Sequence, residues 1–274
     1  MNSPSWKRVR ALISLIASAV LAPVAATGAE KVEEVATEET SWKEAGKARA
    51  NYLQQHFGDL PPGNRMRLIN LMSVARDSSL YTIEAKKLGK DVWAYSTFGL
   101  SNPDMPTRVA AVDPQDVTDD FGRLAGLSAT METRSREPAT APAGAAGYGY
   151  ELMVLAGERA FWPLHILQWA ASAEIFTDVG LLDRVDREGG LTVRDVALGS
   201  EQMGKVNLLF AKPLPPLPAG TQLPNGSMRI LLATVITADE LAWSRINGVE
   251  ALLARLARSG VGQFSFRDRK SVLI

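Results

Sequence analysis

The sequence has no cysteine and only two histidines among its 274 residues. Without cysteine the chain can form no disulfide, no thiolate metal site and no thiol nucleophile. Basic and acidic residues number 30 each, so there is no basic excess that would attract nucleic acid. What is present is 46% apolar residues, enough for one large domain or two small ones with a real core.

The N-terminus has the organisation of a cleavable export signal. An apolar run, Ala11–Leu21, follows three basic residues and precedes small residues at 25–29. The run is shorter than the roughly 20 residues of a membrane span, so a signal peptide over 1–29 is favoured over an uncleaved anchor or a buried helix. We expect cleavage after Ala29 or Ala26, and a periplasmic or secreted protein that keeps no stable membrane anchor.

Beyond the signal, the patterning predicts one α/β (α+β) domain over 41–274, with a mixed, largely antiparallel sheet flanked by helices. The acidic stretch 30–40 is expected to be a flexible lead-in. A helix should follow from Ser41 to about Phe57, because apolar residues recur there at helical spacing. Three strand candidates then suggest an antiparallel meander: 68–75, 80–85 and 92–98.

Residues 107–146 interrupt this pattern and are expected to be an insertion. Asp113-Pro114 offers a helix cap followed by a proline in the first turn, which predicts a short helix ending near Gly126. The Ala, Thr, Pro and Gly residues of 139–147 predict an exposed loop. Strand pairing must resume after this insertion, because the next segment again alternates.

Strands are predicted at 148–156, at 206–211 and at 228–236, and the nearly continuous apolar character of the third favours a central place in the sheet. Residues 161–176 change to a helical period. One stripe of this helix, which we expect in the core, contains Trp162, Ile166, Trp169, Ala173 and Phe176.

A sharply defined helix start follows the last predicted strand. Thr237 and Glu240 have the spacing of a capping box, and Ile236 and Leu241 have that of a hydrophobic staple. This helix should end at 247–248, before a last helix that ends at Gly260.

Six short segments stand in a particular order along the chain. The first two contain T-x-G-x-S…M and G-(Y/F)-x-E-L patterns: Tyr81-Thr82 through Ser96-Thr97-Phe98-Gly99-Leu100-Ser101 with Met105, and Gly147-Tyr148-Gly149-Tyr150-Glu151-Leu152. The next two are a W…LLQ helix and a turn before a strand: Trp162 to Leu167-Gln168, and Leu198-Gly199-Ser200. The last two contain P-N-G…T-x-x-E-L and a closing segment: Pro224-Asn225-Gly226 with Leu231 to Thr237-Ala238-Asp239-Glu240-Leu241, and Arg269 to Leu273. Together, over roughly residues 48 to 274, they resemble the suppressor of fused-like domain.

This resemblance implies a mixed sheet flanked by helices, and binding rather than catalysis. Animal members of the family sequester a transcription factor by gripping a peptide as an added strand, and bacterial members occur among proposed immunity proteins that neutralise toxins. The chain departs from the animal pattern in its export signal, its 107–146 insertion and its lack of a second domain like their C-terminal half. Transcription-factor binding therefore does not fit an exported protein.

Other motifs favour ordinary structural roles. Residues 199–206 approximate a phosphate-binding loop, but Val206 offers no hydroxyl to magnesium and the segment precedes a strand. His56 and His165 lack zinc-ligand spacing, and a structural or solvent-facing role is favoured for His165 over general-base catalysis. The alternating ligands and central glycine of a calcium loop are missing around four acidic residues: Asp113, Asp116, Asp119 and Asp120.

Two further features leave alternatives open. Tyr148 and Tyr150 can pack under the helix, which is favoured, or anchor a partner. The proline-rich connector between Pro213 and Pro224 is either a rigid contact loop or a long connection.

We therefore expect an exported, non-catalytic protein-binding domain with one protein partner and no nucleic acid. No catalytic, cofactor-binding or metal-binding residue is predicted, and the partner-binding residues are not assigned. A toxin-neutralising (immunity) role is the sharpest form of this hypothesis. Two alternatives are a periplasmic hydrolase built from scattered Asp and Glu residues with His165, and a small-ligand-binding or structural envelope protein.

Overall fold

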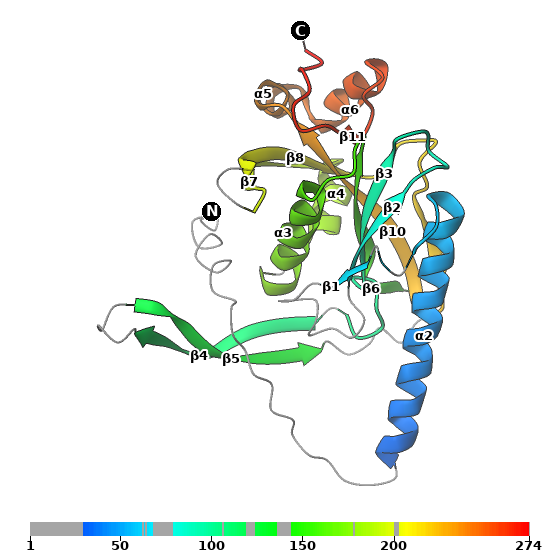
Figure 1. The fold of residues 1–274 in the computed structure, drawn as a ribbon, viewed down its shortest axis with the longest axis vertical. Helices are drawn as coiled ribbons and strands as arrows, with labels where there is room; N and C mark the ends of the chain where they lie inside the picture. Colours follow the sequence, from blue (N-terminus) through cyan, green and yellow to red (C-terminus); the bar gives the residue numbers. More distant parts are fainter. Residues whose placement is uncertain are drawn as a thin grey trace.

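The computed structural model describes residues 30–61, 63, 65–67, 79–105, 107–118, 124–135, 144–177, 179–199 and 203–273. Helices cover both faces of a central sheet, with α2 along one side and α3 on the other (Figure 1). The elements are α2 (Glu30–His56), β1 (Arg65–Arg67), β2 (Ser79–Glu84), β3 (Trp93–Phe98), β4 (Thr107–Thr118), β5 (Leu124–Ser135), β6 (Ala145–Ala156), α3 (Trp162–Thr177), α4 (Leu181–Glu188), β7 (Leu191–Ala197), β8 (Lys205–Ala211), β9 (Gly220–Leu223), β10 (Gly226–Ile236), α5 (Ala238–Asn247), α6 (Val249–Arg258) and β11 (Phe264–Ser265).

The central sheet is mixed and mostly antiparallel, as predicted. Within the described residues it has nine strands, in the order β1-β2-β3-β6-β10-β8-β7, with β9 beside β10 and β11 beside β6. Only the pairings of β6 with β10 and with β11 are parallel. The strand predicted at 228–236 is β10, and it lies at the centre between β6 and β8.

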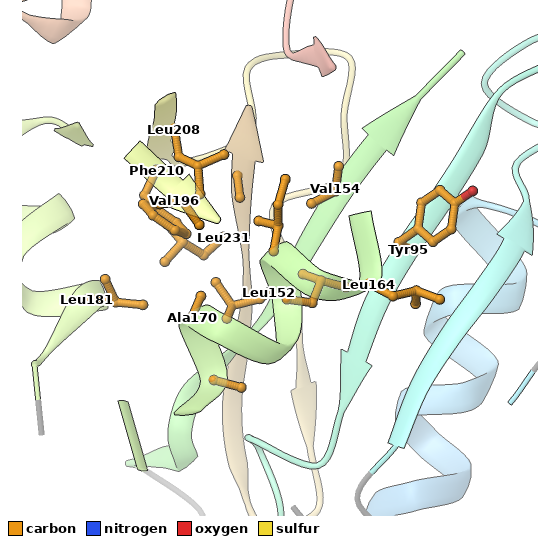
Figure 2. Packing of buried hydrophobic residues seen from close by; sticks show 14 of the residues in the cluster. Tyr95, Leu152, Val154, Leu164, Ala170, Leu181, Val196, Leu208, Phe210 and Leu231 are labelled. Carbon is orange, nitrogen blue, oxygen red and sulfur yellow. The ribbon is translucent and has the colours of Figure 1, made fainter. Parts of the chain in front are cut away.

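Side-chain alternation along the central strands divides the core between the two faces. Leu152 and Val154 of β6 and Leu231 of β10 lie in the cluster that α3 and α4 cover (Figure 2). Their neighbours Met153 and Leu232 lie in a second cluster with the C-terminal half of α2. Both faces of the sheet are therefore buried, which explains the nearly continuous apolar sequence of β10.

Helix α3 is buried around most of its circumference, more widely than the single tryptophan stripe predicted. Trp162 and Ile166 belong to the core, and Trp169 and Phe176 are partly buried against it. At the other end of the domain, α5 and α6 pack on β8 and β10 through a third cluster. The predicted staple residues Ile236 and Leu241 both belong to this cluster.

The C-terminal segment enters the sheet between two strands that have separated. Phe264 and Ser265 form β11, which pairs in parallel with the last residues of β6. On the other side, the Ser265 hydroxyl accepts a hydrogen bond from the Val235 amide at 2.9 Å and donates one to the Ala233 carbonyl at 3.5 Å. Residues near the end of the chain thus complete the centre of the sheet.

The 107–146 region differs from the prediction. Instead of a short helix from Asp113-Pro114 to Gly126, β4 and β5 form an antiparallel two-stranded ladder that extends away from the main sheet (Figure 1). The register shifts between Val112 and Gln115, so Asp113 and Pro114 lie in a bulge. Proline lacks an N–H donor and is tolerated in a strand at such a place. The Asp-Pro pair suits a helix start locally, but cross-strand pairing decides the outcome.

Other boundaries also differ. Helix α2 begins at Glu30, so the 30–40 stretch expected to be a flexible lead-in is helical. The elements α4, β7 and β9 were not predicted. The predicted strand at 68–75 lies outside the described residues, as does most of the predicted 139–147 loop. No helix in the described part of the chain is both long and apolar enough to cross a membrane.

Candidate functional site

The residues that carry the sequence motifs meet at one end of β3 and β6. Glu151 of β6 is fully buried, and the Arg49 guanidinium from α2 donates to its Oε1 at 2.7 Å. Two hydroxyls also donate to this carboxylate. Thr97 Oγ1, near the end of β3, donates at 2.6 Å, and Ser101 Oγ, in the loop after β3, donates at 2.7 Å. The T-x-G-x-S and E-L motifs are thus parts of one buried cluster.

The backbone after β3 also turns toward the Glu151 carboxylate. The amides of Gly99 and Ser101 donate to Oε1, both at 3.0 Å, and the amide of Leu100 donates to Oε2 at 3.3 Å. Successive N–H groups that converge in this way form a concave anion site. Here the anion is a side chain of the protein itself, so the arrangement fixes the loop rather than an external ligand.

Arg49 completes the cluster and joins it to α2. It also donates to Ser101 Oγ at 2.9 Å and to Asn102 Oδ1 at 2.6 Å, and its guanidinium carbon lies 4.1 Å from the centre of the Phe98 ring. A buried arginine must have its charge paired, and here Glu151 pairs it while both terminal nitrogens donate; the buried Nε has no hydrogen-bond partner among the described residues. Sequence analysis did not single out Arg49. Its signal is its position in the apolar stripe of the helix, four residues after the buried Ala45.

The charge state of Glu151 follows from competing effects. Burial alone would raise its pKa, but Arg49 and the Thr97 and Ser101 hydroxyls outweigh burial, and the pKa is lowered below its usual value. Glu151 is therefore ionised at neutral pH and engaged by donors on both oxygens. We assign this carboxylate a structural role, because a general acid or base needs access to a substrate proton.

Two more motif segments attach to the same loop. The Tyr148 amide donates to the Leu100 carbonyl at 2.9 Å, and Asn225 Nδ2 donates to the Ser101 carbonyl at 3.0 Å. A β-carbon on Gly147 would lie 2.4 Å from the Leu100 carbonyl oxygen, and Gly147 has φ 59°. Only glycine fits there. We call Arg49, Thr97, Ser101, Asn102 and Glu151 the Glu151 cluster.

A second buried ion pair lies at the start of α5. The predicted capping box of Thr237 and Glu240 is confirmed. Both Glu240 oxygens also face Arg269, at 2.5 and 2.6 Å, and the Val272 amide donates to Oε1 at 2.9 Å. Burial would raise the pKa of Glu240, but the hydrogen bonds of Arg269 and the amides of Thr237 and Val272 lower it overall.

The two tyrosines of β6 have different environments. Tyr150 is buried in the core beneath α3, which confirms the packing role for this residue. Burial and the neighbouring Glu174 raise the pKa of Tyr150 well above its usual value of 10. Tyr148 is half-buried at the edge of the same cluster. The connector after Pro213 is structural in part, because it contains β9 and places Leu217 and Leu223 in or against the cluster that includes the C-terminal half of α2.

The remaining candidate residues are not brought together. His56 stacks near Tyr52 with ring centres 4.7 Å apart, whereas the half-buried His165 packs on Gly199. Asp113 and Asp116 lie in β4, and Asp119 and Asp120 fall outside the described residues, as do 200–202 of the phosphate-loop-like segment. Among the residues that the structure describes, no group of three or more His, Asp or Glu side chains could hold a metal ion.

Comparison with known proteins agrees with the motif pattern. A family model described as suppressor of fused protein (SUFU) matches residues 76–270. The chain belongs to the suppressor of fused family. Most of the Glu151 cluster lies inside the range matched by the SUFU model, whereas its arginine, Arg49, lies outside that range.

Two solved structures are similar to this SUFU-family chain at low identity. The crystal structure of Drosophila Suppressor of Fused has 17% identity and a TM-score of 0.42, over 72% of this chain and 42% of the Drosophila chain. A crystal structure of the Sufu-Fu complex contains a chain with 18% identity and a TM-score of 0.47, over 84% of this chain and 93% of that one. This chain therefore spans less than half of the Drosophila chain. No curated protein matches.

Proposed function

We propose that this SUFU-family chain is an exported, non-catalytic domain that binds one protein partner through surface complementarity. The observation that carries the proposal is the buried state of the motif residues. The Glu151 and Glu240 carboxylates are enclosed by donors from the protein itself. The motifs therefore support a rigid scaffold, and function falls to the surface of that scaffold.

Family membership supports binding as the activity. A structure described as the Sufu-Fu complex shows that a SUFU protein has been crystallised with a protein partner. The scaffold here is suited to a similar task, because its sheet is covered on both faces and braced by two buried ion pairs. Rigid surfaces lose little conformational entropy on association.

Affinity capture tests the binding proposal. The chain, carrying a tag after residue 274, is expressed in its native host and recovered with its bound proteins. We expect one protein to be recovered reproducibly in a stoichiometric amount, and none from cells that express the tag alone. Recovery of no stoichiometric protein, together with turnover of a small-molecule substrate panel, would contradict the proposal.

Export is supported by the sequence of residues 1–29, in which basic residues, an apolar run and small residues follow one another. Fractionation followed by intact-mass measurement tests this directly. A periplasmic or secreted form that begins at Glu30 or Thr27 is expected. A cytoplasmic form that keeps Lys7 and Arg8 would show that the segment is not a cleaved signal.

A toxin-neutralising role is the sharper form of the proposal, supported by export together with membership in this family. The test is a growth assay with toxins encoded beside this gene in the same genome. The chain with residues 1–29 should protect cells against a toxin directed to the periplasm, whereas a chain that begins at Met followed by Glu30 should not. Equal growth in both cases would contradict neutralisation and leave partner binding unaffected.

A further inference from the structure

The sequence contains two Asn-Gly pairs, Asn225-Gly226 and Asn247-Gly248. In such a pair the backbone nitrogen of the glycine can attack the side-chain amide of the asparagine, because glycine has no side chain to hinder the approach. The first pair lies at the turn between β9 and β10, and the second at the end of α5. The fold therefore surrounds the same two reacting groups in different ways.

The reaction is a deamidation, which needs only water. The nitrogen of Gly226 forms a bond to Cγ of Asn225 and gives up its proton. The bond between Cγ and Nδ2 breaks, and Nδ2 leaves as ammonia. Water then opens the cyclic imide at either of its carbonyl carbons. One opening gives aspartate, and the other gives isoaspartate, in which the main chain runs through the former side chain.

Contacts on both sides of the turn oppose this ring closure at Asn225. Asn225 Nδ2 donates to the Ser101 carbonyl at 3.0 Å, and the Ser227 amide donates to the Gly144 carbonyl at 2.8 Å. Gly226 is packed so closely that a β-carbon there would lie 2.6 Å from the Gly144 oxygen. Ring closure must rotate the Asn225 side chain and the main chain next to Gly226, so these contacts have to break first.

The buried Oδ1 of Asn225 adds a second obstacle. This oxygen has no hydrogen-bond partner among the residues that the structure describes. Attack on Cγ moves negative charge onto the oxygen, and a donor aimed at it would stabilise that charge. The folded domain supplies no such donor, so its interior does not assist the reaction.

Asn247 is less protected. It is the exposed last residue of α5, where its Nδ2 donates to the Trp243 carbonyl at 3.0 Å and the Gly248 amide donates to the Ser244 carbonyl at 2.8 Å. Both bonds belong to the last turn of a helix, and helix ends fray. A β-carbon on Gly248 would meet nothing within 4 Å, so a changed backbone has space there.

An acid at position 225 cannot restore the contacts of the asparagine. Aspartate is ionised at neutral pH and has no donor for the Ser101 carbonyl. It also brings negative charge to a loop whose Ser101 amide and hydroxyl already bind the Glu151 carboxylate. Isoaspartate lengthens the main chain of a turn that must hold Gly226 opposite Leu223.

We propose that Asn225-Gly226 is a deamidation site controlled by folding. The folded domain preserves Asn225, whereas an unfolded chain converts it to aspartate or isoaspartate. A converted chain folds with a weakened junction between the β9–β10 hairpin and the loop after β3. The extent of conversion at position 225 thus measures how long a chain has been unfolded.

Peptide mapping of the purified full chain tests the protection. The protein is incubated at mildly alkaline pH with and without urea, and mass spectrometry quantifies conversion at positions 225 and 247. In urea the two positions should convert at comparable rates. In buffer alone, position 225 should convert at least about tenfold more slowly than position 247, because it must wait for an opening of the hairpin.

A substitution in the loop after β3 tests whether the contact with Ser101 is the cause. Ser101→Ala removes a hydroxyl donor to Glu151 but keeps the carbonyl that Asn225 contacts. The loosened loop should speed conversion at position 225 in buffer and leave the rate at position 247 unchanged. Equal rates at position 225 in Ser101→Ala and in the wild type would show that this loop does not protect the asparagine.

Urea unfolding of single variants tests the consequence of conversion. Asn225→Asp should lower the folding equilibrium constant about thirtyfold, because it leaves a buried acceptor without its donor and adds a charge beside it. Asn247→Asp is the matched control. It places a negative charge at a helix C-terminus and should lower the constant about threefold or less.

Three outcomes would overturn the proposal. One is equal conversion of both positions in buffer, and another is wild-type stability of Asn225→Asp. The third covers the case in which Asn225→Asp does not fold. Wild-type protein aged in urea is then refolded by dilution, and chains converted at position 225 should collect in the unfolded fraction. Their equal presence in the folded fraction would show that the modification is harmless.

Discussion

Two buried arginine–glutamate pairs brace this domain from opposite ends of the chain. Arg49, near the start, reaches Glu151, whereas Arg269, near the end, reaches Glu240. The Arg49 pair attaches α2 to the central sheet, and the Arg269 pair attaches the C-terminal segment to α5, the helix that follows the sheet. They differ in how many other groups take part. Glu151 also receives two hydroxyls and three amides, whereas Glu240 also receives the amides of Thr237 and Val272.

The Glu151 cluster joins segments that are distant in the sequence, whereas Glu240 also takes part in a local structure. Glu240 already has a role in its own helix cap, which α5 forms from adjacent residues. Glu151 has no local partner of this kind, because its donors come from α2, from β3 and from the loop after β3. We therefore expect the domain to depend more strongly on the Glu151 cluster than on the Glu240 pair.

The largest effect should come from Glu151→Ala. This change leaves the Arg49 charge and several polar groups buried without their acceptor, and breaking a buried pair costs about 3–5 kcal/mol. Urea unfolding should show this loss, or the variant should fail to fold. Glu84→Ala, which removes an exposed glutamate on neighbouring β2, serves as the control. A loss below about 1 kcal/mol for Glu151→Ala would show that the cluster is dispensable.

Arg269→Met should have the second-largest effect. It removes the charged donors to Glu240 but leaves the capping amides in place, so we expect a loss of about 2–3 kcal/mol, in the upper range for hydrogen bonds to charged groups. Arg267→Met, two residues earlier and exposed, is the matched control. A larger loss for Arg269→Met than for Glu151→Ala would contradict the stronger dependence of the domain on the Glu151 cluster.

Acid should weaken both pairs. The pKa of Glu151 and that of Glu240 are lowered in the folded protein, so each adds stability that is complete above the usual glutamate value of 4.5. That stability is lost as the pH falls below 4.5 toward the folded-state pKa values. The free energy of unfolding should therefore decline in this range, and less steeply for Arg269→Met. Equal slopes for the two proteins would contradict the assignment of Arg269 as the cause.

The smallest effect should come from the exposed network around Asp186. Arg229 and Lys212 contact this carboxylate at 2.8 and 2.7 Å, but all three side chains are substantially exposed to water. Exposed ion pairs contribute about 0–1 kcal/mol, so Asp186→Asn should change stability within that range. High salt should reduce even this difference. If Asp186→Asn lost as much stability as Arg269→Met, and salt did not reduce the loss, exposure to water would not distinguish the Asp186 network from the buried pairs.

The sequence is sufficient for features whose residues are close together. The capping box at Thr237 and the staple between Ile236 and Leu241 depend on spacings of a few residues. The burial of α3 and the central place of β10 follow from periodicity and composition. No single short motif is specific for the SUFU family, so it is the order of the motifs along the chain that indicates the family.

The features that were missed depend on partners distant in sequence. Nothing near Glu151 indicates that Arg49 lies beside it, since 102 residues separate them. The eight residues of α4 are too few for a periodic signal, and Asp113-Pro114 suits a helix cap as well as a bulge.

The late position of β11 has a consequence for how the protein is made. Residues 261–273 are synthesised after all the other strands that the structure describes, so the gap between β6 and β10 stays open until this segment has been made. A nascent chain therefore cannot reach its final packing before residues 261–273 are made. The export proposal requires the chain to cross a translocation channel unfolded. Because the final packing is delayed until β11 has been made, the chain stays competent for transport.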